Sequence, residues 1–284
     1  MALSRPSSFA HYFPPKPPSL EIGKELSRGA YGAVHSGRLD DRKVAVKQIH
    51  RLVETVNRDK EKMLGDFCQE CVLLKRVNHP HVVKFEGAFY DETTDEPLLV
   101  MELMTETLQH YLQRNKGQLS RQKQLEICIS IVRGLHFLHT RTPLVVHRDL
   151  TDKNVLLDAN GVVKISDLGQ SRLKTAEYFS TGQPGSIPFM SPEAMQDPSH
   201  YNEKLDVFSL GVLMLEVATQ QSPRVNMVGI GVTPELQRRS KEFSRLDKDH
   251  PLRAVILSCL KDNPRERPDI ATVLTQLLEV KEVI

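Results

Sequence analysis

Little in the overall composition points to nucleic acid or to a membrane. The 284-residue chain has a formal net charge of only +2, so it lacks the strongly basic balance expected of a nucleic-acid binder. It also lacks a basic start followed by a continuous apolar stretch, so no signal peptide is predicted. The most apolar segment, residues 207–218, is too short to span a bilayer and contains Glu216. We expect a buried helix there, and neither a membrane nor a nucleic-acid partner.

Cysteines are few for a chain of this length. The four cysteines are Cys68, Cys71, Cys128 and Cys259. Such low usage is typical of a reducing compartment, and we expect a cytoplasmic location. Cys68 and Cys71 form a C-x-x-C pattern, which also occurs in metal and redox sites. No second Cys/His pair follows at metal spacing, and the segment has a helical pattern, so we interpret the pair as structural.

The chain begins with a proline-rich leader. Residues 1–19 include Pro14-Pro15-Lys16-Pro17-Pro18, a run that favours extended polyproline geometry and cannot build a core. We therefore expect a flexible, solvated leader. Its P-x-x-P spacing is also one that an SH3-type domain reads, and this is kept as the alternative.

Two regions follow the leader. From Leu20 to Met104, short runs rich in branched residues predict five strands, at residues 22–26, 33–39, 43–49, 82–88 and 98–103, and a helix at 59–77. After Met104 the pattern is helical. Helices are predicted at 120–141, with Ser120 as N-cap, and at 205–219, 234–241, 252–260 and 270–280. The expected fold class is α+β: a small antiparallel five-stranded lobe with one helix, then a larger, mainly helical lobe.

Oxygen ligands gather around a predicted hairpin in the second region. The octet HRDLTDKN (147–154) precedes a strand at 155–157 and a turn at 158–161, after which Asp167-Leu168-Gly169 follows. A hairpin here brings both polar clusters to one edge, with two carboxylates and one carboxamide. Hard oxygen ligands that leave coordination positions open suit Mg²⁺ shared with substrate phosphates.

The first region carries a glycine-rich loop and a lysine. In Ser27-Arg28-Gly29-Ala30-Tyr31-Gly32, the glycines let backbone amides approach phosphate oxygens. A dinucleotide-binding loop would open into a helix. Here the sequence instead continues as a strand and then reaches Val44-Ala45-Val46-Lys47. We therefore predict a hairpin that folds over a nucleotide.

Together these motifs resemble the catalytic domain of eukaryotic protein kinases, most closely the tyrosine-kinase-like group, from about Leu20 to the C-terminus. The resemblance implies one bilobal protein-kinase-like domain, with the N-lobe at 20–104 and the C-lobe at 105–284, and ATP and Mg²⁺ as cofactors. It implies Asp149 as general base, and Asn154 and Asp167 as metal ligands. It also implies Lys47 as a phosphate ligand paired with Glu70, rather than with Glu61 or Asp66. The residues it implies around the nucleotide are Leu26, Ser27, Gly29, Gly32, Val34, Ala45, Lys47, Glu70, Met101, Glu102, Met104 and Leu156, with Met101 as gate and backbone groups of 102–104 as hinge.

Other positions fit the same resemblance. Ser191-Pro192-Glu193 stands where kinases have Ala-Pro-Glu, and Arg267 is expected to pair with Glu193 as a bidentate anchor. Asp206 matches the aspartate that caps a helix and braces the catalytic loop. Phe208 stands where many kinases place Trp.

The substrate class is less sharply defined by the sequence. Lys153 stands where tyrosine kinases usually carry Arg, and it could neutralise the transferring phosphate. The segment 185–193 instead resembles the serine/threonine pattern, in which a hydroxyl at Ser186 bonds to Asp149 and Lys153. We favour serine/threonine transfer to a protein substrate, with dual specificity next and tyrosine specificity as the further alternative.

Control by phosphorylation is predicted around Arg148, which directly precedes Asp149 and could bind a phosphate on the activation segment. The hydroxyl candidates there are Ser171, Thr175, Tyr178, Ser180 and Thr181. We hypothesise that Ser180 or Thr181 is the switch, because both lie mid-loop.

Two readings of other classes stay open. The chain could be a pseudokinase scaffold, for which the departures at Ser27, Thr151 and Leu168 are the only marks. A small-molecule phosphotransferase is disfavoured by the Ser-Pro-Glu segment and its arginine partner, which by resemblance belong to kinases of polypeptides.

Overall fold

The computed structural model describes residues 13–29, 32–48, 57–94, 96–168, 171–173, 186–197, 201–223 and 246–283. The chain divides into two compact units. The first comprises Met1–Asn78 with Val83–Met104, and the second comprises His79–Val82 with Thr105–Ile284. No helix among these described residues is long and apolar enough to cross a membrane.

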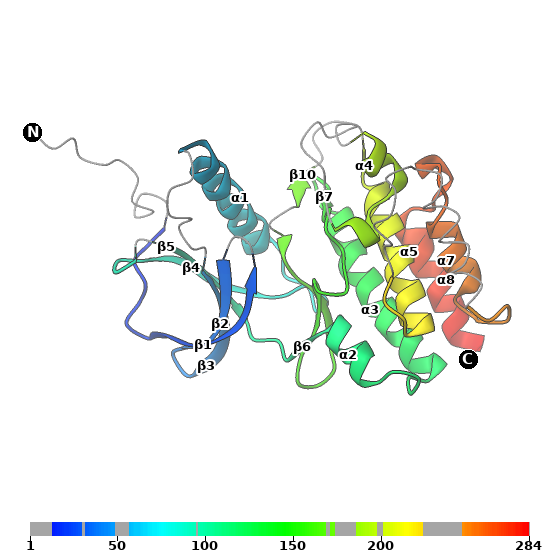
Figure 1. Cartoon of the computed structure of the whole chain (residues 1–284), viewed down its shortest axis with the longest axis horizontal. Helices are drawn as coiled ribbons and strands as arrows, with labels where there is room; N and C mark the ends of the chain where they lie inside the picture. Colours follow the sequence, from blue (N-terminus) through cyan, green and yellow to red (C-terminus); the bar gives the residue numbers. More distant parts are fainter. Residues whose placement is uncertain are drawn as a thin grey trace, which may run out of the picture. The chain divides into compact units, whose positions relative to one another are not determined.

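The first unit is a five-stranded antiparallel sheet with one helix (Figure 1). Its strands pair in the order β1-β2-β3-β5-β4. Branched and aliphatic side chains from four of these strands form the core of the unit, where they are almost fully buried. The elements are β1 (Leu20–Gly29), β2 (Gly32–Leu39), β3 (Arg42–Gln48), α1 (Asn57–Arg76), β4 (Phe85–Asp91) and β5 (Glu96–Glu102). This confirms the predicted fold class for the first region.

The fourth strand differs from the prediction. A strand was expected at 82–88, but β4 runs Phe85–Asp91. Val82 instead forms an isolated bridge with Ile165, and the His81 carbonyl oxygen accepts a hydrogen bond from the Ile165 amide at 2.9 Å. Residues 79–82 therefore group with the second unit. The branched residues at this point predicted a strand from residue 82, but Val82 pairs with Ile165, which lies far along the chain.

The leader also differs in part from the expectation of a solvated segment. Residues before Phe13 lie outside the described part of the chain. From Phe13 onward the segment is hydrogen bonded to β4: the Lys16 amide donates to the Tyr90 carbonyl at 2.8 Å, and the Tyr90 amide donates to the Pro14 carbonyl at 3.0 Å.

The second unit is mainly helical, and its helices pack around one large apolar core. The long helix α3 begins after Ser120, as predicted, because the Ser120 hydroxyl accepts a hydrogen bond from the Lys123 amide at 3.2 Å. The helices are α2 (Leu108–Arg114), α3 (Arg121–His139), α4 (Pro192–Gln196), α5 (Lys204–Thr219), α7 (Arg253–Cys259) and α8 (Ile270–Val283), with 3-10 turns η3 (Ile187–Phe189) and η4 (Pro264–Glu266). The helix expected at 234–241 falls outside the described residues.

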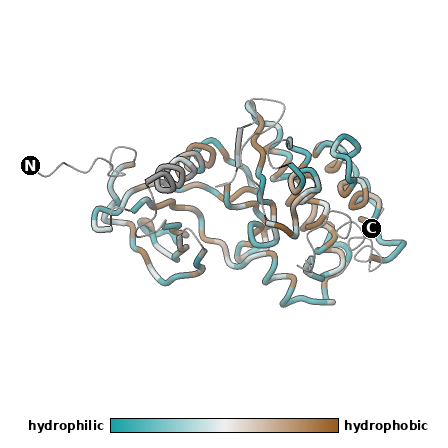
Figure 2. The backbone as a smooth tube through the Cα atoms, turned by 45° about the horizontal axis from the view of Figure 1, so that its top comes forward, coloured by the Kyte–Doolittle hydropathy of each residue, from teal (hydrophilic) through white to brown (hydrophobic). Residues whose placement is uncertain are grey.

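Hydropathy explains why α5 lies at the centre of this unit. Apolar and polar residues alternate in patches along the chain (Figure 2), but residues 205–217 of α5 are all buried. Gly211 permits close packing with α7, since a Cβ atom there would lie 2.7 Å from Leu260 Cγ and 2.9 Å from Cys259 Cβ. The buried helix predicted from the apolar run is therefore confirmed.

Short strands position the polar motifs of the second unit. The strand β8 (Val155–Leu157) pairs antiparallel with β9 (Val163–Ile165) and with β6 (Glu106–Thr107), and β7 (Val145–Val146) pairs with β10 (Arg172–Leu173). The β8–β9 hairpin is the one predicted between the two polar clusters. Its turn is fixed by the Asp158 carboxylate, which accepts hydrogen bonds from the Asn160 and Val162 amides at 2.8 Å each.

Candidate active site

A lysine–glutamate pair lies in the first unit. Lys47 is in β3, opposite Val34 and Leu99, and its Nζ lies 2.9 and 3.1 Å from the two carboxylate oxygens of Glu70 in α1. The Glu70 side chain is only 3% exposed and that of Lys47 is 24% exposed. This is the contact that the sequence predicted. The side chains of Glu61 and Asp66 lie outside the described residues.

The glycine-rich segment is a hairpin, as predicted. The β1–β2 pairing continues to Gly29 opposite Gly32, and residues 30 and 31 between them lie outside the described residues. Gly32 opens a strand, whereas the dinucleotide alternative requires a helix at this point. The pairing also places Ser27 opposite Val34.

The apolar residues expected around a nucleotide differ in exposure. In the first unit Ala45 and Met101 are buried, Val34 is half-buried, and Leu26 is 45% exposed. Leu156, in the second unit, is half-buried on β8. Met104 is half-buried as well. Apolar side chains that are half-buried or exposed can still lose solvent-accessible surface to a ligand, which applies to Leu26, Val34, Met104 and Leu156.

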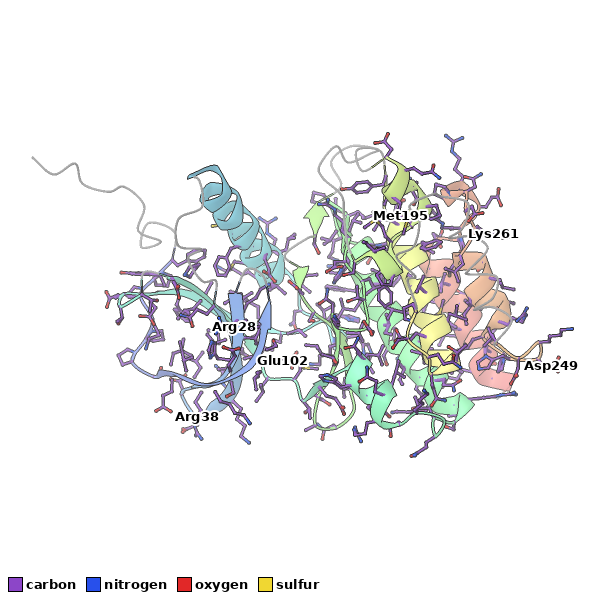
Figure 3. All side chains as sticks on the ribbon, viewed as in Figure 1. Arg28, Arg38, Glu102, Met195, Asp249 and Lys261 are labelled. Atoms are coloured by element: carbon purple, nitrogen blue, oxygen red, sulfur yellow. The ribbon has the colours of Figure 1, made fainter. Side chains whose placement is uncertain are left out.

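The predicted hinge begins at the end of β5, where Figure 3 labels Glu102. The Glu102 amide donates to the Lys84 carbonyl at 3.0 Å, and its carboxylate accepts from the Lys84 amide at 2.7 Å. The amide of Glu102 is thus occupied within the sheet. The hinge bonds that the resemblance implies would fall to the Glu102 carbonyl and to Met104.

The second unit holds Asp149 in a hydrogen-bonded setting. Its Oδ2 accepts from Asn154 Nδ2 at 2.9 Å, and its Oδ1 accepts from the Ser186 amide at 2.9 Å and hydroxyl at 3.1 Å. The predicted contact between Ser186 and Asp149 is present. The expected second contact of Ser186, with Lys153, is not found among the described residues, and Lys153 is exposed.

The hairpin brings the two predicted metal ligands together through backbone contacts. The amide and hydroxyl of Ser166 both donate to the Asn154 carbonyl, at 2.8 and 2.9 Å, so Asp167, the next residue, follows close to Asn154. Asp167 has a φ of +59°, a left-handed conformation that aspartate tolerates better than most residues. The next residue, Leu168, is fully buried, and Gly169 lies outside the described residues.

These donors fit Mg²⁺. Asn154 uses its nitrogen toward Asp149, so its metal-binding atom would be Oδ1. Among the described residues no group of three or more His, Cys, Asp or Glu side chains is arranged to hold a metal ion. Two side-chain oxygens with the other positions left to phosphates and water are what Mg²⁺ takes beside nucleotides, whereas Zn²⁺ or Ca²⁺ sites recruit more protein ligands.

Asp206, the first-turn acid of α5, braces the loop that carries Asp149. Its carboxylate accepts hydrogen bonds from the amides of His147 and Arg148 and from His139 Nε2, all at 2.8 Å. Burial alone would raise the pKa of Asp206, but the hydrogen bonds and the charge of His139 outweigh it, and the pKa lies below its ordinary value. The brace predicted from the sequence is confirmed.

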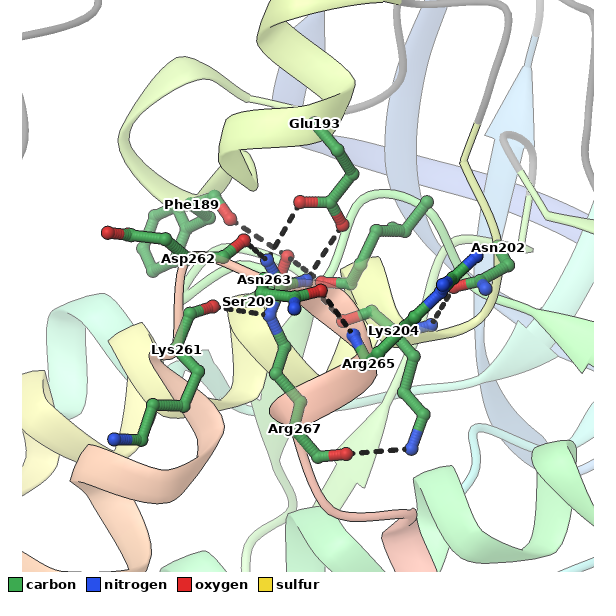
Figure 4. A network of polar contacts seen from close by, with 11 residues as sticks. Phe189, Glu193, Asn202, Lys204, Ser209, Lys261, Asp262, Asn263, Arg265 and Arg267 are labelled. Carbon is green, nitrogen blue, oxygen red and sulfur yellow. Dashed lines mark hydrogen bonds and ion pairs between the residues drawn. The ribbon is translucent and has the colours of Figure 1, made fainter.

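The predicted anchor between Glu193 and Arg267 is also present (Figure 4). Arg267 Nη1 and Nη2 donate to the two Glu193 carboxylate oxygens at 2.7 and 2.8 Å, in a bidentate pair. The Arg267 side chain is 0% exposed, and its guanidinium lies 4.9 Å from the centre of the Phe208 ring. Phe208 thus supplies an aromatic face at the position where many kinases have Trp.

A buried acid pair was missed by the sequence reasoning. Asp152 is 3% exposed and accepts a hydrogen bond from Gln109 Nε2 at 2.9 Å, and its carbonyl accepts from the Gln109 amide at 3.0 Å. Burial, together with the charge of Asp152, raises the pKa of Glu216 in α5 to about 8. The only signal in the sequence was an acid inside the apolar run.

The activation segment is only partly within the described residues. Ser171 is fully buried, and its hydroxyl donates to the His147 carbonyl at 3.2 Å, so it is a poor candidate for phosphorylation. The guanidinium of Arg148 lies 5.3 Å from the centre of the Tyr201 ring. The remaining candidates, Thr175, Tyr178, Ser180 and Thr181, lie outside the described residues.

The C-x-x-C pair lies in α1, with Cys68 half-buried and Cys71 buried. Burial raises the pKa of both thiols, and the charge of Glu70 adds to the shift for Cys71. Thiols held in the protonated form are poor metal ligands and poor nucleophiles. The structural interpretation therefore accounts for both residues.

Comparison with known proteins shows similarity to protein kinases. Residues 20–277 match the family model for protein tyrosine and serine/threonine kinases. Among similar curated proteins are the serine/threonine-protein kinases CTR1 and STY46 of Arabidopsis thaliana, 32% and 31% identical over 91% and 93% of this chain. The dual specificity protein kinase shkA of Dictyostelium discoideum is 30% identical over 94% of it. The matches cover 31%, 45% and 51% of these three relatives, respectively.

Proposed function

The chain belongs to the protein tyrosine and serine/threonine kinase family, and we propose that it transfers the γ-phosphate of ATP to serine and threonine hydroxyls of proteins. One observation carries the proposal: the Ser186 hydroxyl donates to Asp149 Oδ1 at 3.1 Å. A substrate hydroxyl would make the same contact, at the distance that proton transfer requires. We assign residues 20–284 to one kinase domain.

Asp149 is the general base in this proposal. As the substrate oxygen bonds to the γ-phosphorus, the bond from phosphorus to the β-γ bridging oxygen breaks, ADP leaves, and the hydroxyl proton passes to Asp149. A carboxylate suffices because the transition state is loose and the proton is needed late. The contact from Asn154 Nδ2, at 2.9 Å, holds the carboxylate in place. Lys153 is exposed on the same loop, and by its family position it would offset charge on the transferring group.

The nucleotide contacts are assigned from the positions at which this chain matches the kinase family. Lys47, held by Glu70, binds the α- and β-phosphates, and the backbone at Ser27, Gly29 and Gly32 approaches the phosphate oxygens. Asn154 and Asp167 hold Mg²⁺, which neutralises phosphate charge when bound. The adenine contacts are assigned to a set of apolar side chains and hinge groups: Leu26, Val34, Ala45, Met101, Glu102, Met104 and Leu156. The assignment of Lys47 as the residue held by Glu70 is supported by burial. The Glu70 side chain is only 3% exposed, and a buried carboxylate needs a cationic partner.

Serine/threonine specificity is supported by Ser186 and by the names of the relatives. The Ser186 amide and hydroxyl both contact Asp149, which favours a short acceptor side chain at that carboxylate. Two of the similar proteins, CTR1 and STY46, are serine/threonine-protein kinases. Dual specificity is the second candidate, favoured by Lys153 at the tyrosine-kinase position and by the similarity to the dual specificity protein kinase shkA.

Four free thiols support a reducing, cytoplasmic location.

A pseudokinase scaffold is the alternative of another class. The departures that favour it leave the site residues in place. The Thr151 hydroxyl accepts a hydrogen bond from the Asn154 amide at 3.3 Å, and Leu168 is fully buried as an apolar side chain should be. Ser27 pairs with Val34 directly after a register shift in β1, and regular pairing continues from there to Gly29 opposite Gly32.

The test is incubation with Mg²⁺, labelled ATP and a general protein substrate, followed by mapping of labelled residues. Asp149→Asn is compared with the parent chain, and Asp158→Asn, in the turn of the same hairpin, is the matched control. We expect label on serine and threonine with the parent and the control, and none with Asp149→Asn. Labelling of tyrosine by the parent chain to the same extent as serine and threonine would favour dual specificity. ATP binding without transfer would favour the scaffold, and equal labelling by all three chains would refute the role of Asp149.

A further inference from the structure

The segment Phe13–Ser19, called here the N-terminal strap, forms a single β-bridge with the edge strand β4 of the first unit. β4 is the last strand of the sheet order. Pro15 forms a parallel bridge with Tyr90 of β4, flanked by the hydrogen bonds that join Tyr90 to Pro14 and Lys16. An uncovered edge strand invites unwanted pairing, so covering it has a structural use of its own.

The strap is also fastened where it enters β1. The Leu20 amide donates to the Pro17 carbonyl at 2.9 Å, and the Asp40 amide donates to the Ser19 carbonyl at 3.2 Å. Lys16 Nζ donates to the Leu20 carbonyl at 3.3 Å. These contacts use backbone groups over most of the strap. A run of prolines read from composition as solvated is therefore held at both ends.

The first residue of the strap reaches the helix that carries Glu70. The Phe13 ring packs edge-on against the Phe67 ring of α1, with centroids 5.3 Å apart and planes at 80°. Phe67 is 1% exposed and Glu70 is 2% exposed. Residues one turn apart lie on the same side of a helix, so a displacement of Phe67 displaces Glu70.

We propose that Phe13 is a positioning residue for Glu70: the strap, by seating Phe13 on Phe67, keeps α1 where Glu70 meets Lys47. The inference rests on the proposed function, because the Lys47 contact matters for phosphate binding. The strap hydrogen bonds fix the position of Phe13 relative to the sheet, and Lys47 belongs to that sheet. The strap therefore links the two partners of the ion pair.

The SH3-type interpretation of the proline run competes with this arrangement. A polyproline ligand presents backbone carbonyls and ring faces to its receptor. In the strap the Pro14 carbonyl and the Lys16 amide bond to Tyr90, so a receptor would have to remove the strap from β4 and Phe13 from Phe67. An SH3-type partner therefore cannot bind the strap while Phe13 remains packed on Phe67 of α1.

The test compares two pairs of variants. Phe13→Ala removes the ring contact, and Phe13→Tyr restores an aromatic edge. Lys16→Pro removes both the amide that donates to Tyr90 and the Nζ contact with Leu20, whereas Lys16→Ala removes only the Nζ contact, so the pair isolates the amide. Phe89→Ala is the matched control, since Phe89 packs against the sheet core of the same unit. Two measurements do not depend on phosphotransfer. The first is amide hydrogen exchange of residues 66–76 of α1, with residues 98–101 of β5 as the internal reference. The second is the affinity for a fluorescent ATP analogue in the presence of Mg²⁺.

We expect Phe13→Ala and Lys16→Pro to speed exchange of the α1 amides by about threefold to tenfold and to weaken nucleotide affinity by a similar factor. Phe13→Tyr, Lys16→Ala and Phe89→Ala should keep parent values for α1. Parent exchange in Phe13→Ala and Lys16→Pro would overturn the proposal, as would an equal effect of Phe89→Ala. If no variant or parent transfers phosphate, the proposed function fails, but the exchange readout still decides whether the strap seats α1.

Discussion

Replacing Arg267 by lysine should destabilise the second unit far more than removing the charge of its partner. Arg267 donates five hydrogen bonds with its side chain fully buried. Two go to Glu193, and the others go to the carbonyls of Lys261, Asp262 and Lys204 at 2.7, 3.0 and 3.0 Å. A lysine ammonium presents its donors at one point and cannot reach acceptors spread around a planar fork.

The magnitude follows from what each change leaves behind. Arg267→Lys leaves buried carbonyls without donors and weakens the bidentate pair, a loss of about 3–5 kcal/mol in the free energy of unfolding. Glu193→Gln leaves Arg267 with its three carbonyl acceptors and one amide oxygen, and Glu193 is 16% exposed, so we expect only about 1–2 kcal/mol. For a unit of this size the first change lowers Tm by roughly 10 °C.

The assay is urea unfolding and calorimetry of the whole chain, following the transition of the second unit. Arg265→Lys is the matched control, since Arg265 is exposed in the same segment and should change stability by less than about 0.5 kcal/mol. Equal losses for Arg267→Lys and Glu193→Gln would refute the reasoning, because the carbonyl contacts would then contribute nothing beyond the ion pair.

Three further predictions concern single positions. Gly134→Ala should destabilise by about 1–3 kcal/mol, because its Cβ would lie 2.4 Å from the His81 carbonyl oxygen, whereas Gly65→Ala meets nothing within 4 Å and should stabilise by up to about 1 kcal/mol in thermal unfolding. Between the ordinary pKa of 4.5 and the folded value of about 8, the folded chain keeps a proton on Glu216 that the unfolded chain has released; the unfolding free energy should therefore fall as pH rises through this window, and Glu216→Gln should flatten the dependence measured by urea unfolding. Glu70→Gln should lower kcat/KM for ATP by about tenfold to a hundredfold, since the lysine loses a charged acceptor at 2.9 Å; an unchanged value in steady-state kinetics would separate the ion pair from phosphate binding.

Short-range pattern predicted most of the elements. Helical spacing with a Ser120 cap and a long apolar run gave α3 and α5 within a few residues, because their signals lie within the helix itself. The predicted contacts of Lys47 with Glu70 and of Arg267 with Glu193 came from resemblance. Spacing alone could not have selected Glu70 over Glu61 or Asp66, since all three are acids in one helix.

Features that depend on distant partners, and that the resemblance did not supply, were not predicted. The shift of β4 follows from the bridge between Val82 and Ile165, which no local window contains. The pKa of Glu216 depends on burial and on Asp152, far away along the chain. The strap was read as solvated because its composition favours extended structure, yet extended backbone is also what pairs with an open sheet edge. The composition of the strap does not predict whether a sheet edge, such as the one at Tyr90, is present for it to pair with.

The backbone just before Asp149 adopts a strained conformation that hydrogen bonds within the second unit hold in place. Arg148, the residue before the base, has a φ of +72°, a conformation that costs about 1–3 kcal/mol. Its amide and that of His147 each donate at 2.8 Å to the buried carboxylate of Asp206, and hydrogen bonds to a charged group contribute about 1.5–3 kcal/mol each. Two such bonds exceed the cost, so the loop keeps its conformation by contacts within the second unit.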